Sequence, residues 1–137
     1  MNLKHFKYFI DEGIDVEIIN EHGPTEATVG CSIYSFNSLS DNEKIKQSIP
    51  IGTPIDNAQL YILDENNALA PVGIPGELCI GGRGLARGYV NRNERTQEKF
   101  IKNPFNGKDE SKLYKTGDVA RWLNDGTVEY LGRKDDQ

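Results

Sequence analysis

Four short segments of the 137-residue sequence carry side chains that could act on a nucleotide. The first is Asn20-Glu21-His22-Gly23-Pro24-Thr25-Glu26. Gly23-Pro24 predicts a rigid bend, because proline fixes its own φ and restricts its neighbour. After the bend, the Thr25 hydroxyl can donate to a phosphate oxygen, and the Glu26 carboxylate can hold Mg²⁺, which prefers hard oxygen ligands. The alternative for these residues in isolation is an ordinary loop with a threonine turn.

The second segment runs from Gly76 to Tyr89 and contains five glycines. Glycine-rich loops can cradle phosphates, but the Gly-Lys-Ser/Thr end of a P-loop does not follow this one. Glycines at strand ends are more often bulges and tight corners. We therefore interpret this segment as structural, with Arg83 and Arg87 solvated or ion-paired rather than catalytic.

The third and fourth segments lie near the end of the sequence. Asp118 closes Tyr-Lys-Thr-Gly-Asp, and a carboxylate with two acceptor oxygens matches the two hydroxyl donors of a ribose. Arg133 follows Glu-Tyr-Leu-Gly and offers five donors in a fixed fork, suited to sugar or phosphate oxygens. Tyr130 in the same segment could pack near a base. Taken singly, Asp118 could be a turn residue, and Arg133 a solvated charge at a strand end.

The elements that must position these segments are a helix–strand unit and a series of short strands. Leu3, Phe6 and Ile10 share one face at helical spacing, which predicts a helix that stops at Gly13. A buried strand is predicted over 16–19 and a second strand over 28–36. The helix, strand and following loop are typical of the edge of an α/β layer, where ligands bind beyond the strand ends.

From Pro50 onward the pattern favours β structure. Alternating apolar residues predict strands near 58–63 and 78–80, and Asn124-Asp125-Gly126 predicts a hairpin between strands ending in Trp122 and beginning near Val128. A short helix is predicted over 94–100. The expected fold class is α+β: an α/β edge at 1–36, a surface loop at 37–49, a β-rich distorted barrel at 50–131 and the start of a hinge at 132–137.

Composition excludes several classes of function. The net charge of −5 argues against general nucleic-acid binding, which needs a basic face. No run approaches the roughly 20 apolar residues of a membrane helix. Cys31 and Cys79 are expected to be reduced thiols in a cytoplasmic protein. The two histidines, His5 and His22, are too few and too far apart for a zinc site.

In this order, the segments resemble those of the adenylate-forming superfamily, which includes acyl-CoA synthetases, firefly luciferase and the amino-acid adenylation domains of nonribosomal peptide synthetases. The resemblance covers about Ile19 to Gln137. The runs GGRGLARGY, YKTGDVARW and GTVEYLGR are most similar to the peptide-synthetase domains. The resemblance implies that Thr25 contacts the α-phosphate, that Glu26 binds Mg²⁺, and that Asp118 and Arg133 contact the ribose.

The resemblance implies further roles around the base. Asn20 would lie beside the adenine, Tyr130 near the nucleotide, and Asp135 at the hinge to a small C-terminal domain. His22 departs from the family, which usually has tyrosine stacked on adenine at this position. Imidazole is a smaller stacking surface and can become charged near neutral pH, so weaker nucleotide affinity is expected.

The implied reaction joins an amino acid to ATP as aminoacyl-AMP and then passes the acyl group to a phosphopantetheine thiol on a carrier domain. Glu21, Val29 and Gly30 stand where the family's amino-acid pocket is lined. This set resembles the pockets of asparagine-activating domains, and a carboxylate can accept a hydrogen bond from a side-chain amide.

Other parts of the family pattern are missing from these 137 residues: the phosphate-binding loop, the aspartate that positions the substrate, and the C-terminal lysine. The chain alone is therefore expected to be inactive, since charge on a pyrophosphate leaving group needs positive groups held in place. Without its partner layers the chain is also expected to self-associate weakly. Two alternatives stay open: a ligase for fatty or aryl acids, and a β-rich binding module with no catalytic parent.

Overall fold

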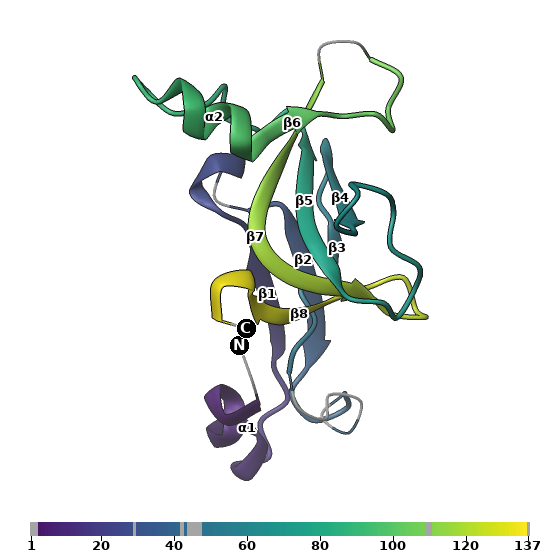
Figure 1. The fold of residues 1–137 in the computed structure, drawn as a ribbon. Coiled ribbons are helices and arrows are strands. Elements are labelled where there is room, and N and C mark those ends of the chain that lie inside the picture. Colours follow the sequence, from purple (N-terminus) through teal and green to yellow (C-terminus); the bar gives the residue numbers. More distant parts are fainter. Residues whose placement is uncertain (1–2, 29, 42, 44–47, 109–110, 137) are drawn as a thin grey trace.

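Two antiparallel sheets form the framework of the computed structural model, which describes residues 3–28, 30–41, 43, 48–108 and 111–136 (Figure 1). The first sheet has the order β1-β2-β3, with β1 at Glu17–His22, β2 at Ser32–Asn37 and β3 at Thr53–Pro54. The second has the order β4-β5-β7-β6, with β8 paired to β7. Its bounds are β4 Ala58–Leu63, β5 Gly76–Gly82, β6 Phe100–Lys102, β7 Lys112–Trp122 and β8 Val128–Arg133.

The helical elements are short. They are η1 Leu3–Phe6, α1 Lys7–Asp11, η2 Thr25–Ala27, α2 Asn93–Lys99 and η4 Lys134–Asp136. The predicted N-terminal helix is therefore present as a 3₁₀ turn continued by one α-helical turn, and α2 confirms the helix expected near 94–100. In the described part of the chain, every helix is too short or too polar to cross a lipid bilayer. This mixture of sheets and few helices is the α+β class predicted from the sequence.

Two strands differ in extent from the prediction. β1 continues to His22, and its exposure alternates, with Ile18 and Asn20 buried while Ile19 lies on the outer face. β2 begins at Ser32 rather than at residue 28. The reason is local: after the Gly23-Pro24 bend the chain makes the 3₁₀ turn η2, and Thr28 adopts a left-handed conformation with φ of 54°. The chain can return as a strand only beyond this turn.

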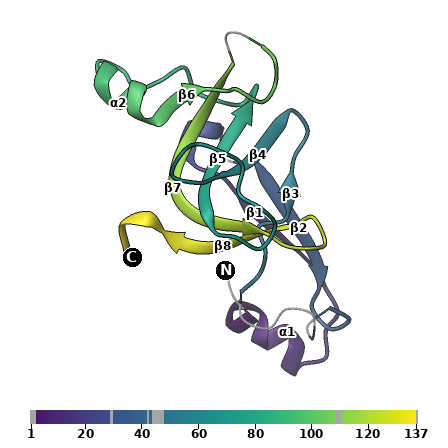
Figure 2. The same ribbon diagram turned by 45° about the vertical axis from the view of Figure 1, so that its right-hand side comes forward.

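The main hydrophobic core lies between the two sheets. Cys31 and Ile51 from the first-sheet side pack with Leu78 and Ile80 of β5 and with Val128 of β8. Cys79 is also fully buried, but in a separate cluster with Leu63 and Leu113, and both cysteines are free thiols. β7 curves strongly in both views and carries the second sheet around this core (Figures 1 and 2).

Gly52 is the point where the two sheets are joined through their backbones. Val128 N–H donates to the Gly52 carbonyl at 2.9 Å, and Ile51 N–H donates to the Val128 carbonyl at 2.9 Å. Gly52 has φ of +83°, and a Cβ added there would collide with the Ile33 carbonyl of β2. Only glycine allows β8 and β2 to approach so closely at this position.

Replacing Gly52 by alanine should therefore disrupt the junction. Gly73 is a matched control, because it has the same φ of +83° but a Cβ there would meet nothing within 4 Å in the described structure. Gly73→Ala is expected to cost about 1 kcal/mol through backbone strain alone, whereas Gly52→Ala should cost at least about 3 kcal/mol. Urea unfolding of the two variants measures the difference. Equal losses of stability would show that the close approach at Gly52 contributes nothing.

Candidate active site

Asp118 and Arg133 lie opposite each other where β7 pairs with β8. Arg133 Nη1 donates to Asp118 Oδ1 at 2.9 Å, and Asp118 as a whole is only 8% exposed. The other carboxylate oxygen, Oδ2, lies 3.9 Å from Nε2 of His22 on β1. Hydrogen bonds between charged groups are stronger than neutral ones, so this pair fixes the two side chains that the family resemblance assigns to the ribose.

Two β-bulges flank this pair. Three residues of β7, 116 to 118, lie opposite the single residue Leu78 of β5, and Leu131 is an extra residue in β8. Both bulged segments contain a glycine at positive φ, Gly117 at +76° and Gly132 at +118°. Bulges bend a strand and redirect its side chains. Gly117 and Gly132, in the third and fourth segments of the sequence analysis, are therefore part of the local geometry that places the Asp118 carboxylate.

His22 and Tyr130 bring an aromatic face to the same place from the two sheets. Their ring centroids are 5.8 Å apart with an interplanar angle of 42°. His22 Nε2 is buried and has no hydrogen-bond partner among the described residues. Burial lowers the pKa of His22, and the nearby charge of Asp118 only partly offsets this. The imidazole is therefore neutral at neutral pH and presents a flat, weakly polar ring.

Glu26 is held in the 3₁₀ turn η2, next to Thr25. Tyr89 donates its hydroxyl to Glu26 Oε1 at 2.9 Å, and the Tyr89 and Tyr114 hydroxyl oxygens are 3.4 Å apart. Burial opposes ionisation of Glu26, yet hydrogen bonds from its own backbone and from Tyr89 leave its pKa below the usual value. Sequence reasoning missed both tyrosines, because nothing in the spacing along the chain links Glu26 to Tyr89, which lies 63 positions later, or to Tyr114, which lies farther still.

β7 connects the two groups of residues. Tyr114 near its start faces Glu26, and Asp118 faces His22. Four residues of extended strand span at most roughly 13 Å, which is the scale of a nucleoside monophosphate. Asp118 therefore faces the β1 segment that leads into the turn carrying Thr25 and Glu26, although these residues are more than 90 positions apart in the sequence.

Other predicted residues lie at the edges of this arrangement. Asn20 is buried, and its side-chain amide donates to the Pro50 carbonyl at 2.8 Å. Asp135 is exposed in η4, 3.6 Å from Arg133 Nη2. Glu21 is exposed and lies against Gly30, where an added Cβ would collide with the Glu21 carboxylate. Val29 lies outside the described residues.

A divalent cation would find one carboxylate here rather than a cage. Within the described ranges no three histidine, cysteine, aspartate or glutamate side chains gather as a metal site. Glu26 is ionised and is oriented by Tyr89. Mg²⁺ commonly takes one or two protein carboxylates and completes its shell with water and substrate phosphates. The residues present therefore fit a magnesium ion that arrives with a nucleotide.

Comparisons with known proteins identify the family of this chain. The model of the AMP-binding enzyme family matches residues 3–90. Tyrocidine synthase 3 of Brevibacillus parabrevis is 51% identical over 125 residues, which are 91% of this chain and 2% of that protein. The chain therefore spans a small part of that relative.

Two solved structures have the same fold. PA1221, a peptide-synthetase protein with adenylation and PCP domains, matches with a TM-score of 0.82 and 30% identity over 96% of this chain and 22% of its own. The N-terminal subdomain of NpsA from Klebsiella oxytoca, solved with 3-hydroxybenzoyl-AMSN, matches with a TM-score of 0.81 and 29% identity over 97% of this chain and 33% of its own. The chain belongs to the AMP-binding enzyme family, as a piece of an adenylation domain of the nonribosomal peptide synthetase type.

Proposed function

We propose that the protein containing this chain activates an amino acid with ATP. The substrate carboxylate attacks the α-phosphorus, the bond to the β-phosphate oxygen breaks, and aminoacyl-AMP and pyrophosphate form. A phosphopantetheine thiol on a carrier domain then attacks the acyl carbon and AMP leaves. The observation that supports this most directly is that Asp118, Arg133, His22 and Tyr130 converge from two sheets. Glu26 lies beside Tyr114, which belongs to the same strand β7 as Asp118.

In this proposal Asp118 and Arg133 hold the ribose. Arg133 occupies one lone pair of Asp118 Oδ1, and a carboxylate has about four acceptor sites. Enough sites remain for two adjacent ribose hydroxyls. Because Asp118 is nearly buried, its pairing with Arg133 also avoids the cost of an isolated charge.

Thr25 and Glu26 would serve the phosphates. Thr25 follows the proline bend and would donate its hydroxyl to an α-phosphate oxygen. Glu26 would bind the Mg²⁺ that accompanies ATP, with Tyr89 fixing the orientation of its carboxylate. The metal would neutralise charge that develops on the leaving pyrophosphate.

The adenine would lie beside His22, Tyr130 and Asn20. The tilted His22 and Tyr130 rings give two aromatic surfaces for a base. The Asn20 side-chain nitrogen already donates to the Pro50 carbonyl at 2.8 Å, and its side-chain oxygen is a hydrogen-bond acceptor. That oxygen can accept from an adenine amino group.

Glu21 and Gly30 support an amino acid with an amide side chain as the substrate, and we propose asparagine. Gly30 leaves the space that the Glu21 carboxylate occupies. A carboxylate in this position can accept a hydrogen bond from a side-chain amide N–H, and Val29 would line the same pocket. An aryl acid is the second candidate, because the NpsA structure carries 3-hydroxybenzoyl-AMSN. A charged glutamate in the pocket disfavours an apolar ring.

The remaining protein would cover the outer face of the first sheet. Ile19 and Ile33 on this face are 58% and 42% exposed. Apolar patches of this kind mark a contact with another layer. The rest of the adenylation domain is the proposed occupant, and Asp135 would act as the hinge to its C-terminal part. Without that layer, the chain alone is expected to associate weakly with itself.

The proposed function is tested by ATP–pyrophosphate exchange with the full-length protein across the amino acids and a set of aryl and fatty acids. Exchange is expected to be strongest with asparagine, because its amide can pair with Glu21. The 137-residue chain alone should give no exchange. Strong preference for an apolar amino acid would exclude asparagine, preference for an aryl acid would favour the second candidate, and exchange by the chain alone would contradict the expected inactivity.

Replacing Asp118 by asparagine tests the ribose contact. The variant keeps the shape of the side chain but loses its charge and one acceptor, so the KM for ATP should rise at least about ten-fold, or about 1.4 kcal/mol. Glu98→Gln on the exposed face of α2 removes the same charge away from the site and serves as the control. An unchanged KM for ATP in the Asp118→Asn variant would remove Asp118 from the nucleotide site.

Replacing His22 by tyrosine tests the base contact through its pH dependence. The pKa of His22 is lowered in the folded protein, so its contribution to stability is complete above the unfolded pKa of about 6.5 and is lost as the pH falls through the folded value. In the wild type, the KM for ATP should rise and the unfolding free energy should fall below about pH 6. His22→Tyr should flatten both profiles. Superimposable profiles for the two proteins would contradict the contact.

A further inference from the structure

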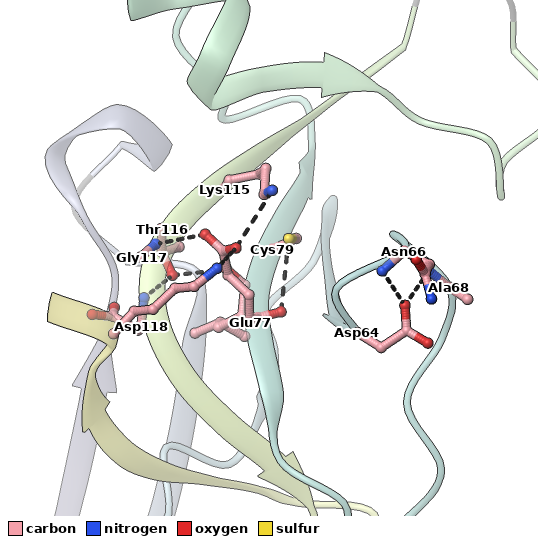
Figure 3. Close-up of polar contacts among 11 residues, drawn as sticks. Asp64, Asn66, Ala68, Glu77, Cys79, Lys115, Thr116, Gly117 and Asp118 are labelled. Carbon is pink, nitrogen blue, oxygen red and sulfur yellow. Dashed lines mark hydrogen bonds and ion pairs between the residues drawn. The ribbon is translucent and has the colours of Figure 1, made fainter. Parts of the chain in front are cut away.

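We infer that Glu77 is a positioning residue that fixes the ribose-binding bulge of β7 and the start of the hinge with one carboxylate. This inference rests on the proposed function. Glu77 lies on β5, and its side chain is only 10% exposed. Figure 3 shows it directed at β7, beside Gly117 and Lys115. The polar partners of its carboxylate among the described residues are Gly117, Lys115 and Lys134, none of which is assigned above to the nucleotide, so it would act only through others.

The first oxygen of Glu77 holds the Thr116–Gly117 peptide, one residue before Asp118. Gly117 N–H donates to Glu77 Oε1 at 3.2 Å. On the other side of the same peptide, the Thr116 carbonyl accepts from Arg133 Nη1 at 2.8 Å. A trans peptide is planar and its N–H and C=O point in opposite directions. The Thr116–Gly117 peptide is therefore held between a carboxylate and a guanidinium.

The bulge makes this contact necessary. Residues 116 to 118 of β7 lie opposite a single residue of β5, so Gly117 has no register partner on β5 or β8, and its N–H donates to the Glu77 side chain. A backbone N–H left unpaired away from water costs about as much as a lost hydrogen bond. Glu77 supplies the missing acceptor, and Asp118, the next residue, takes its direction from this peptide. Arg133 binds both the peptide and the Asp118 carboxylate.

The second oxygen of Glu77 holds two lysines. Lys115 Nζ and Lys134 Nζ lie 3.5 and 3.4 Å from Oε2. Lys115 belongs to β7, whereas Lys134 opens η4 and stands next to the proposed hinge residue Asp135. One carboxylate thus connects three elements: β5, the β7 bulge and the segment that leads into the hinge.

Two substitutions separate the two functions of this carboxylate. Glu77→Gln keeps an oxygen that can accept from Gly117 but removes the charge that attracts the lysines. Glu77→Ala removes both contacts. Glu65→Gln is the matched control, because Glu65 is exposed and lines the same surface pocket of about 450 Å³ as Glu77, Lys115 and Lys134.

The experiment measures ATP–pyrophosphate exchange and backbone hydrogen exchange in the full-length protein. Glu77→Ala should raise the KM for ATP about ten-fold with a smaller change in kcat, while Glu77→Gln should stay within about two-fold of the wild type. Hydrogen exchange over 114–118 should accelerate only in Glu77→Ala. Hydrogen exchange over 134–136 should accelerate in both Glu77 variants. The control Glu65→Gln should match the wild type in every measurement.

Several outcomes would overturn the inference. An unchanged KM for ATP in Glu77→Ala would overturn it, and so would an equal rise of the KM for ATP in the Ala and Gln variants. Either result would show that the Gly117 acceptor does not matter. Unchanged hydrogen exchange over 134–136 would remove the connection to Lys134. If the wild type shows no pyrophosphate exchange with any acid, the proposed function fails, and the hydrogen-exchange comparison alone still decides whether Glu77 fixes the two segments.

Discussion

The pairing of Asp118 with Arg133 is the interaction on which the site depends. It joins β7 to β8 at the place where both strands are bulged, and it puts a nearly buried carboxylate against β1 of the other sheet. A buried charge is tolerated only when it is paired and hydrogen-bonded. The same guanidinium also binds the Thr116 carbonyl. One arginine thus satisfies both the side chain that would bind the ribose and the backbone that aims it.

The two-sheet architecture explains why residues so distant in sequence can converge. β1 delivers His22 and then bends at Gly23-Pro24 into the turn that carries Glu26. β7 runs past both, with Tyr114 at one end of the site and Asp118 at the other. Gly52 allows the sheets to come together through backbone contacts, so their relative position depends on main-chain geometry more than on any one side chain.

Sequence reasoning predicted the residues that the two sheets bring together better than it predicted the residues that support them. The fold class, the hairpin around Asn124-Asp125-Gly126 and helix α2 followed from alternation and turn residues. The extents of β1 and β2 did not, because the 3₁₀ turn after Pro24 and the left-handed Thr28 are local features without a periodic signal. Tyr89, Tyr114 and Glu77 were missed for a related reason. Their contacts depend on strand register and on bulges, and neither can be derived from residue spacing along one chain.

The complete burial of the two thiols has a chemical consequence. Burial raises the pKa of Cys31 to about 11 and that of Cys79 to about 12. Since the thiolate is the form that reacts with electrophiles and oxidants, neither sulfur is reactive while the sheets stay packed. Cys31 lies in the core between the sheets, whereas Cys79 lies in the other cluster with Leu63 and Leu113. Opening of one cluster would therefore expose one cysteine without exposing the other. The two cysteines are therefore natural reporters of which side of the second sheet comes apart first.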